Sequence, residues 1–248
     1  MKRYGLIGFP LSHSFSQRYF TEKFAKENIA ESVYENFAIE SIVKFPELIQ
    51  KYSDLCGMNV TIPYKVEVMK YLDEVNETAS EVGAVNTVKF EKSTGKTRLI
   101  GYNTDIYGFE ITLSPLLEKH HTKALILGNG GASKAVKYVL KKLGISFVFA
   151  TITSPVENEI TYESIDKELI DECKLIVNCT PLGTYPNVDT CPNIPYEFIS
   201  NKHILYDLVY NPEVTKFMQQ GMNQGAKVQN GLKMLHAQAE GAWKIFNR

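Results

Sequence analysis

Two residues that can exchange a proton, Lys65 and Asp105, each lie in a short and strongly polar segment. Lys65 ends the run Asn59-Val60-Thr61-Ile62-Pro63-Tyr64-Lys65, and Asp105 ends the run Asn103-Thr104-Asp105. A lysine and a carboxylate can share the work of proton transfer. A glycine-rich turn follows at 128–133, and such a turn between a strand and a helix can hold a dinucleotide pyrophosphate. This order of segments indicates a dehydrogenase.

The glycine-rich turn has the sequence Gly128-Asn129-Gly130-Gly131-Ala132-Ser133. It follows the apolar segment Lys123–Leu127, which we predict to be a buried strand, and it opens a predicted helix from Ala132 to Leu143. Glycines let the backbone approach a pyrophosphate, and a helix N-terminus attracts negative charge. The last position of the fingerprint is Ser133 instead of Gly or Ala. The alternative is a tight strand–helix turn that binds nothing.

The end of the next strand normally chooses the cofactor. An Asp or Glu there favours NAD, and an Arg favours the extra phosphate of NADP. This chain has neither directly after the predicted strand Ser146–Thr151, where Glu157 is the nearest acid. The hydroxyls of Thr151, Thr153 and Ser154 can receive a phosphate, but more weakly than a guanidinium. The pattern therefore leaves both NADP and NAD open.

A second polar site is indicated around Lys65. We predict a strand from Gly57 to Ile62, on which Asn59 and Thr61 point the same way and face one pocket. Pro63 suits the first position of a helix, so Lys65 is expected on its first turn, leaning over the same strand end.

Three serines, Ser12, Ser14 and Ser16, alternate after a glycine-proline turn. Hydroxyl donors at this spacing suit a carboxylate or a polyol. The alternative is local capping of a helix that begins near Gln17, above all for Ser16.

The 248 residues suffice for one large domain or two small ones, and strands alternate with helices along them. This alternation predicts an α/β fold with parallel sheets covered by helices on both faces. A hairpin is expected where residues 83–90 and 97–102 flank a turn at 92–95. Further strands are predicted at Val33–Ile39, Lys174–Asn178 and His203–Asp207, and a last amphipathic helix at Gly231–Phe246.

The composition argues against several classes of protein. With 27 basic and 28 acidic residues, nothing favours a nucleic acid or a membrane surface as partner. No apolar run reaches the roughly 18 residues that span a bilayer. No metal site is expected, and the four cysteines show no ligand spacing, which predicts reduced thiols in a cytoplasmic protein. They are Cys56, Cys173, Cys179 and Cys191.

Eight ordered segments together resemble one known family, the shikimate dehydrogenases, over nearly the whole chain. Any one of these segments alone would be weak, but eight in the same order argue against chance. They are Gly8–Ser16, Asn59–Lys65, Gly83–Thr87, Gly101–Asp105, Gly128–Ser133, Asn178–Gly183, Tyr206–Pro212 and Gly231–Ala239.

The resemblance implies two α/β domains. Residues 1–102 plus about 225–248 would form the substrate-binding domain, to which the C-terminal helices return. Residues 103–224 would form the Rossmann-like NADP-binding domain. The implied activity is the reversible NADPH-dependent reduction of 3-dehydroshikimate to shikimate, on the route to chorismate and the aromatic amino acids. The expected partners are small molecules only, and the chain would act as a monomer or homodimer.

The resemblance also implies roles for individual residues. Those matching Lys65 and Asp105 form the catalytic pair. The substrate carboxylate would be held by Ser14, Ser16 and Tyr210, and the substrate hydroxyls by Asn59, Thr61, Asn86 and Gln238. Cofactor contacts would come from Gly128 to Ser133, from the hydroxyls of Thr151, Thr153 and Ser154, and from Thr180, Leu208 and Gly231.

The implied chemistry is reasonable for these side chains. Hydride that arrives at a ketone carbon builds negative charge on the oxygen, which a cationic proton donor stabilises. Lys65 is the candidate donor, and Asp105 would keep it charged and oriented. The alternative is a surface ion pair, which is worth only about 0–1 kcal/mol.

The chain departs from the family pattern in its cofactor half. An arginine-bearing stretch is replaced by 150–154, Thr184 stands where a methionine is common, and Asn129 replaces a small residue. We therefore expect weaker discrimination between NADPH and NADH than is usual for the family.

Three other functions stay open at this point. One is an NAD-dependent quinate/shikimate dehydrogenase, which shares every substrate motif. Another is a non-catalytic dinucleotide-binding or regulatory protein, whose sequence mark would be loss of Lys65 or Asp105, yet both are present. The third is a two-domain dehydrogenase of another polar hydroxy acid.

Overall fold

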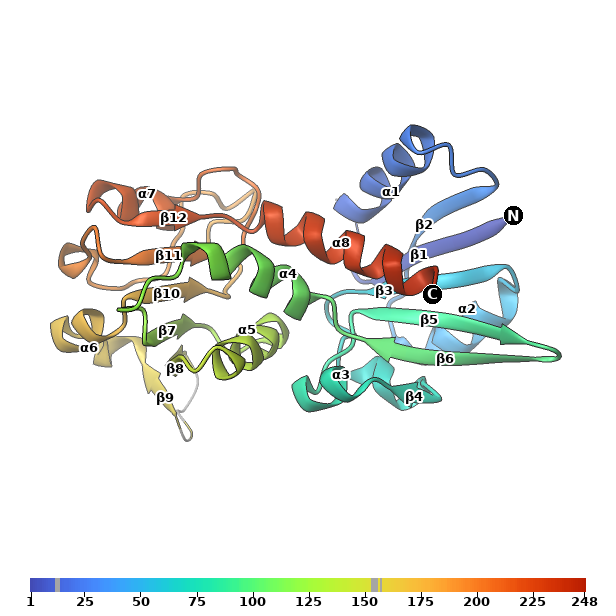
Figure 1. Cartoon of the computed structure of the whole chain (residues 1–248), viewed down its shortest axis with the longest axis horizontal. Coiled ribbons are helices and arrows are strands. Elements are labelled where there is room, and N and C mark those ends of the chain that lie inside the picture. Colours follow the sequence, from blue (N-terminus) through green and yellow to red (C-terminus); the bar gives the residue numbers. More distant parts are fainter. Residues whose placement is uncertain (12–13, 153–155, 157) are drawn as a thin grey trace. The chain divides into compact units, whose positions relative to one another are not determined.

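The computed structural model describes residues 1–11, 14–152, 156 and 158–248 (Figure 1). The chain divides into two compact units: Met1–Thr104 with Ala239–Arg248, and Asp105–Gln238. The sequence-based division placed the boundaries after residue 102 and near residue 225. Within the described residues, none of the helices combines the length and the apolar character that a membrane crossing requires.

The first unit is built on a six-stranded sheet in the order β2-β1-β3-β5-β6-β4. Strands β2, β1 and β3 are parallel, whereas β5 runs antiparallel to both of its neighbours. The hairpin expected around residues 92–95 is confirmed, because a tight turn at Thr94-Gly95 reverses the chain between β5 and β6. The strands are β1 (Lys2–Gly8), β2 (Ser32–Ala38), β3 (Leu55–Val60), β4 (Glu74–Val75), β5 (Thr87–Ser93) and β6 (Lys96–Tyr102).

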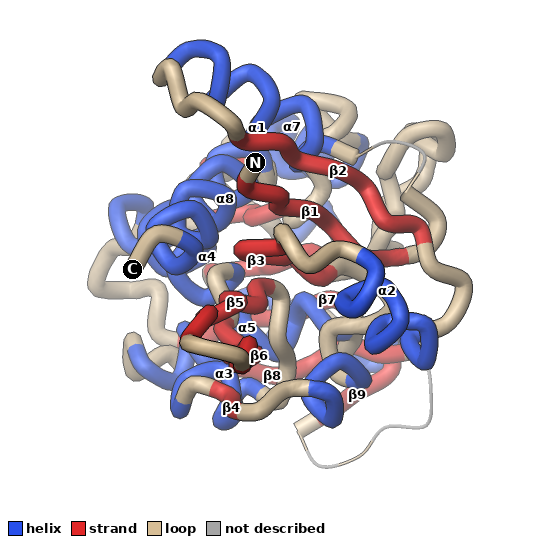
Figure 2. Tube along the Cα trace, turned by 90° about the vertical axis from the view of Figure 1, so that its right-hand side faces the viewer, coloured by secondary structure: helices blue, strands red, loops and turns tan. Residues whose placement is uncertain are grey.

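Helices cover both faces of the parallel part of this sheet (Figure 2). On one face, Tyr4 of β1 packs against Phe24 of α1 and against Trp243 and Phe246 of α8 (Leu232–Phe246). On the other face, Ile7 belongs to a cluster that includes Phe45 of α2. The helical segments are α1 (Phe15–Lys26), η1 (Ile42–Lys44), α2 (Phe45–Lys51), η2 (Glu67–Tyr71) and α3 (Glu77–Val82).

The predicted strand from residue 83 begins four residues later, at Thr87. Gly83 instead ends α3 in the left-handed conformation, with φ of +66°, which glycine adopts without strain. Residues 84–86 then cross to the sheet as connecting backbone, and this displacement leaves Asn86 just outside the strand.

The second unit is built on an all-parallel, six-stranded sheet in the order β12-β11-β10-β7-β8-β9. Counted from β7, this is the strand order 3-2-1-4-5-6 of a dinucleotide-binding fold. The chain adds strands outward on one side of β7 and then on the other, so the strand order changes direction between β7 and β10. The strands are β7 (Lys123–Leu127), β8 (Ser146–Thr151), β9 (Glu159–Thr161), β10 (Leu175–Asn178), β11 (Ile204–Asp207) and β12 (Lys227–Gln229).

Buried apolar side chains make these strands nearly continuous hydrophobic runs, as expected for a parallel sheet covered on both faces. On one face, Phe109 of α4 packs edge-on against Tyr206 of β11. On the other, Phe217 of α7 joins the cluster around Leu125 and Ile176. The helical segments are α4 (Asp105–Leu113), η3 (Ser114–Leu116), α5 (Gly131–Lys142), η4 (Tyr162–Ser164), α6 (Lys167–Glu172), η5 (Tyr196–Phe198), α7 (Lys216–Asn223) and α8 (Leu232–Phe246).

Candidate active site

A buried polar network in the first unit holds Asn59 at the end of β3. The Tyr34 hydroxyl donates to Asn59 Oδ1 at 2.8 Å, and Ser16 also hydrogen bonds to Tyr34. Asn59 Nδ2 faces the Asn86 carbonyl at 3.3 Å and Thr87 Oγ1 at 3.2 Å. Burial raises the pKa of Tyr34, so its hydroxyl keeps its proton and serves as a donor. The network therefore links Ser16 to Asn59 through a tyrosine that the motifs did not indicate.

Asn86 is the centre of this network. Its Oδ1 accepts from the Thr104 N–H at 2.7 Å, from Thr104 Oγ1 at 3.2 Å and from Thr87 Oγ1 at 3.0 Å. Its backbone N–H donates to the Tyr102 carbonyl, and its carbonyl accepts from the Val60 N–H. Asn86, Thr87 and Thr104 are all buried. Asn86 thus ties the end of β3 to the end of β6.

Lys65 does not lie on a helix, so that prediction is wrong. Residues 62–66 form turns, and the following 3₁₀ helix begins only at Glu67. The Lys65 carbonyl accepts from the Val85 N–H at 2.7 Å and so is committed to the connection before β5. This bond fixes the half-buried Lys65 next to the Val85-Asn86 pair in the fold.

Thr61 follows β3 instead of lying on it, because the strand ends at Val60. The Thr61 N–H still donates to the Ile7 carbonyl at 2.9 Å, which keeps the residue beside the end of β1. There a Cβ on Gly8 would lie 2.4 Å from Thr61 Cγ2, so only glycine fits. The shared strand face expected for Asn59 and Thr61 is therefore replaced by a turn at the end of that strand.

Ser14, and not Ser16, caps the first helix. Helix α1 begins at Phe15, and the Gln17 N–H donates to the Ser14 hydroxyl at 3.4 Å. Ser16 lies within the first turn and reaches Tyr34 instead. Capping thus explains Ser14 in part, and the two serines have different local roles. Ser12 lies outside the described residues.

Asp105 is the first residue of α4 and the first of the second unit. The residue is buried. One turn later, a Cβ on Gly108 would lie 2.7 Å from the Met234 carbonyl and 3.4 Å from Gln238 Cβ. Glycine at 108 therefore lets α8 pack closely on α4 and places Gln238 beside that helix.

The glycine-rich turn has the geometry of an anion-binding loop. Gly128 has φ of +91°, and a Cβ there would lie 2.9 Å from Thr180 Cγ2. A Cβ on Gly130 or Gly131 would meet nothing within 4 Å, so the space over the turn is open. No side chain caps α5, whose first N–H groups have no acceptor within the helix. These residues fit the pyrophosphate of a dinucleotide.

Ser133 secures this turn from within. It is buried, and its hydroxyl donates to the Gly130 carbonyl at 2.7 Å. Its backbone N–H approaches the same carbonyl at 3.2 Å. The N–H groups of Gly131 and Ala132, at the start of α5, are therefore the candidates to bind an anion.

A second polar network lies at the carboxyl ends of β10 and β11. Asn178 donates to Asp207 at 2.9 Å and accepts from the Thr180 hydroxyl at 2.7 Å. Asp207 also accepts from the Val209 N–H at 3.0 Å and from Thr215 Oγ1 at 2.6 Å. This network holds Thr180 against Gly128.

Leu208 and Gly231 lie together. The Gly231 N–H donates to the Val209 carbonyl at 3.0 Å, and a Cβ at this position would lie 2.2 Å from the Leu208 carbonyl oxygen. Only glycine permits this approach. Tyr210 nearby in the sequence is half-buried, and burial raises its pKa.

An acid lies beside the glycine turn that the motifs did not indicate. Asn129 Nδ2 donates to a carboxylate oxygen of Glu159, at the start of β9, with a distance of 3.2 Å. Thr151 is buried at the end of β8. Thr153, Ser154 and Glu157 lie outside the described residues.

No cluster of three or more metal-ligating side chains occurs in the described parts of the chain. The four cysteines have free thiols. Burial raises the pKa of the Cys173 thiol to about 11, which leaves it protonated and unreactive at neutral pH.

Comparisons with known proteins assign this arrangement to a family. Residues 6–88 match the family model described as the shikimate dehydrogenase substrate binding domain. A shikimate dehydrogenase (NADP(+)) of Clostridium beijerinckii is 40% identical over 99% of this chain and 92% of its own length. The chain belongs to the shikimate dehydrogenase family.

Solved structures of shikimate dehydrogenases have the same fold. The Thermus thermophilus enzyme, in complex with NADP(H) and shikimate, matches with a TM-score of 0.81 at 30% identity. The match covers 99% of this chain and 93% of that enzyme. The Listeria monocytogenes enzyme, in complex with shikimate and NAD, matches with a TM-score of 0.86 at 26% identity. The match covers all of this chain and 92% of that enzyme. The expected α/β fold and the family resemblance are confirmed.

The structure gives contacts to several residues for which the sequence indicates no individual role. Asn178 and Asp207 were within matched segments, and only their shared network shows what they do. Tyr34 lies 25 residues from its partner Asn59, and no local pattern joins them. Glu159 could be found only from the pairing of β9 with β8.

Asp207 predicts a pH-dependent stability. Burial raises its pKa from 3.8 to about 6, although three donors oppose that shift. A raised pKa means that folding favours the neutral acid, so stability is lost as pH rises from about 4 to above 6. We expect the free energy of unfolding of the wild type, relative to Asp207→Asn, to fall by on the order of 2–3 kcal/mol over this range.

Urea unfolding of both proteins at pH 4, 5, 6 and 7 measures this difference. The variant keeps the shape of the side chain but does not titrate. The difference in unfolding free energy between the two proteins therefore cancels the contribution of all other titrating groups. A constant difference between the two proteins across the series would contradict the raised pKa.

Proposed function

We propose that this chain catalyses the reversible NADPH-dependent reduction of 3-dehydroshikimate to shikimate, in the biosynthesis of chorismate and aromatic amino acids. One observation carries the assignment of the catalytic pair. The Val85 N–H binds the Lys65 carbonyl, and the adjacent Asn86 side chain binds Thr104, the residue before Asp105. Two neighbouring residues thus fix the two backbone segments that carry the proposed acid and its partner.

The residues of the first unit bind the substrate in this proposal. Ser14 and Ser16, with Tyr210 of the second unit, hold the carboxylate. The ring hydroxyls are contacted by amide and hydroxyl groups, those of Asn59, Thr61, Asn86 and Gln238. Asn59 and Asn86 are already oriented by protein hydrogen bonds, so little side-chain freedom is lost on binding.

Proton transfer is assigned to Lys65. NADPH, when bound, supplies the hydride to the ketone carbon. The Lys65 ammonium stabilises the charge that develops on the ketone oxygen and donates the proton to it. Asp105, the first residue of α4, keeps Lys65 charged and oriented in this proposal.

Cofactor binding is assigned to the second unit. The N–H groups of Gly131 and Ala132 meet the pyrophosphate, with Gly128, Asn129, Gly130 and Ser133 shaping the turn. Thr180, Leu208 and Gly231 line the same carboxyl edge of the sheet, where open α/β folds bind their ligands. The hydroxyls of 151, 153 and 154 stay the proposed phosphate contacts. A cytoplasmic location and a monomeric or homodimeric state also stay predictions.

The function is tested by initial rates of shikimate oxidation with NADP and with NAD, and of quinate oxidation with both. We expect turnover of shikimate with NADP. A preference for quinate with NAD would favour a quinate/shikimate dehydrogenase instead. Absence of turnover with every pair would favour the non-catalytic alternative.

Replacement of the proposed acid should remove the chemical step. We expect Lys65→Ala to lower kcat by about 10²- to 10⁴-fold with little change in KM, because positioned proton donation acts in the transition state. Lys70→Ala is the matched control, since Lys70 lies on the adjoining η2 and is exposed. Steady-state kinetics of both variants measure kcat and KM. A near-normal kcat for Lys65→Ala would show that this residue has no part in the mechanism.

Glu159 should weaken selection for the phosphate of NADPH. Its carboxylate is held beside the glycine turn by Asn129, and a carboxylate near the cofactor ribose repels a phosphate. We expect Glu159→Gln to tighten NADPH binding by about threefold to tenfold, or roughly 0.7–1.4 kcal/mol. NADH binding should change by less than about twofold, because it has no such phosphate.

Nucleotide fluorescence titration of the substrate-free protein measures both affinities directly. Glu168→Gln, an exposed acid on α6, serves as the control. An equal change for NADPH and NADH would show that Glu159 does not sense the phosphate.

A further inference from the structure

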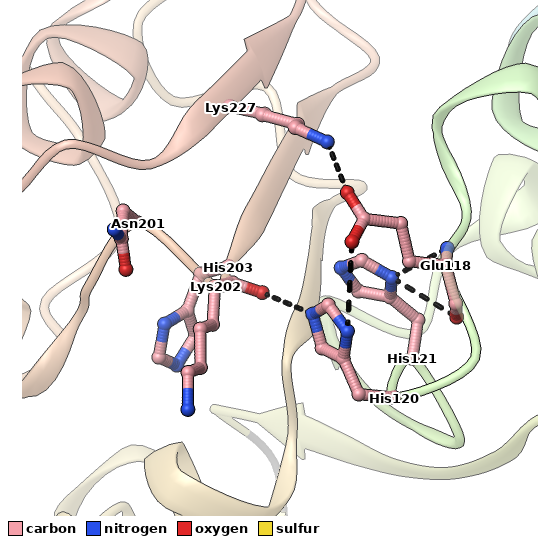
Figure 3. A pocket seen from close by; sticks show the side chains of 7 residues that line it. All are labelled: Glu118, His120, His121, Asn201, Lys202, His203 and Lys227. Carbon is pink, nitrogen blue, oxygen red and sulfur yellow. Dashed lines mark hydrogen bonds and ion pairs between the residues drawn. The ribbon is translucent and has the colours of Figure 1, made fainter.

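A small polar pocket lies at the amino edge of the parallel sheet of the second unit, the edge opposite the glycine-rich turn (Figure 3). Its walls come from the loop before β7, from the loop before β11 and from the first residue of β12. Its volume is about 170 Å³, which suits a small ion or acid and excludes a dinucleotide. The residues that line it, besides His203, are Glu118, His120, His121, Asn201, Lys202 and Lys227.

His121 presents a buried donor to this pocket. Its side chain is 4% exposed, and Nδ1 accepts from the Glu118 N–H at 2.8 Å. The Glu118 carbonyl also lies 3.3 Å from Nδ1, but the shorter contact with the Glu118 N–H makes Nδ1 an acceptor and assigns the proton of the neutral ring to Nε2. Among the described residues Nε2 has no hydrogen-bond partner. The Lys202 carbonyl, which accepts from His120 Nε2 at 3.0 Å, also influences the His121 ring but does not meet hydrogen-bond geometry with Nε2.

A buried N–H group without an acceptor is unusual and calls for one from outside the protein. In Figure 3, Nε2 of His121 points away from the Glu118 backbone and toward the space between the two loops. What this position lacks is an acceptor, which a ligand oxygen would supply.

The charges of the pocket favour an anion. Lys202 and Lys227 contribute two ammonium groups, and Glu118 contributes one carboxylate, which forms an ion pair with Lys227. Lys227 holds the pKa of Glu118 below its usual range, so that pair is ionised at neutral pH. The lining is thus positive by one charge with neutral histidines.

The histidines here do not form a metal site. His203 is fully buried and uses both ring nitrogens, with the Ser200 N–H at 3.0 Å and the Ile170 carbonyl at 3.0 Å. His120 donates through Nε2, and His121 accepts through Nδ1. The rings therefore offer few lone pairs to a cation, and two lysines would repel it.

We propose that this pocket binds a small oxyanion of the phosphate class, with His121 Nε2–H and Lys227 Nζ as its donors and Asn201 at the rim. One oxygen accepts from His121, and another shares Lys227 with Glu118. The site is separate from the glycine-rich turn, because it lies at the other edge of the same sheet. The proposal does not depend on the reaction assigned above.

The affinity of this site for an anion should rise as pH falls. Burial, with the neighbouring His120, lowers the pKa of His121, so the ring is neutral in the empty pocket at neutral pH. An anion favours the protonated ring and therefore binds more tightly where protons are available. His203 is also buried with a lowered pKa and stays neutral, whereas Glu118 opposes the anion and Lys202 and Lys227 attract it.

The test is nitrogen NMR of the histidine side chains in the complete protein, titrated with sodium sulfate against sodium chloride at equal ionic strength. Sulfate is the first probe because its charge does not change over this pH range. We expect a saturable change in the His121 ring signals with sulfate and none with chloride. His121→Gln assigns those signals among the five histidines of the chain.

Lys227→Gln should weaken sulfate binding by at least about tenfold, because it removes a charge-assisted hydrogen bond. Lys167→Gln, an exposed lysine on α6, should leave the affinity unchanged. The proposal is overturned if sulfate causes no saturable change, if chloride does the same, or if Lys227→Gln binds like the wild type. Saturating NADP should leave the sulfate affinity of this pocket unaltered.

Inorganic phosphate and glycerol 2-phosphate then distinguish the source of the anion. Binding of the free ion alone points to inorganic phosphate. Binding of both points to the phosphate group of a small metabolite. Failure of both to cause the His121 response would overturn the phosphate class.

Discussion

The three hydrogen bonds accepted by Asn86 Oδ1 are the constraint on which the substrate half depends. They bring the ends of β3 and β6 together, although β5 separates these strands in the sheet. All three donors are threonine groups in buried surroundings, where an unmet polar group costs about 1–3 kcal/mol. The hydrogen bonds of Asn86 can all form only when the ends of β3 and β6 are both in place. The network therefore also positions the residues that follow these two strands.

A similar device operates at the cofactor half. Asp207 accepts hydrogen bonds from Asn178, Val209 and Thr215. Asn178 in turn accepts from the Thr180 hydroxyl and so fixes Thr180. The fold tolerates a buried acid because its oxygens are satisfied, and this acid fixes the loops after β10 and β11. Both halves thus use a buried polar hub at the carboxyl ends of strands, where an α/β fold positions its ligands.

Sequence patterns predicted the regular parts of the fold well. The strands β7 and β8 begin and end at the expected residues, since each is a short apolar run bounded by turn residues. The family was found because its motifs are dense and ordered, and the comparisons confirm it. Asn59 and Asn86 share one hydrogen-bond network, whereas their contacts with a substrate and the pairing of Lys65 with Asp105 stay predictions.

Patterns failed where partners far apart in sequence decide the structure. Lys65 was expected on a helix because Pro63 suits a helix start, but the distant Val85 N–H captures its carbonyl. The capping of α1 fell to Ser14 because the helix begins two residues earlier than the apolar pattern indicated. The contact of Glu159 with the glycine turn was not predicted because the edge strand β9, which brings it there, was not predicted from the sequence.

Helix α8 has a consequence for how the gene can be divided. The chain passes from the first unit to the second after Thr104 and returns after Gln238, in the middle of this helix. Its last residues, including Ala242 and Phe246, cover the aromatic face formed by Tyr4, Phe20 and Phe24. A fragment that stops at the first crossing would leave this face in water, so the N-terminal half is not a self-sufficient module. A divided gene that keeps this packing must therefore supply residues 239–248 along with residues 1–104.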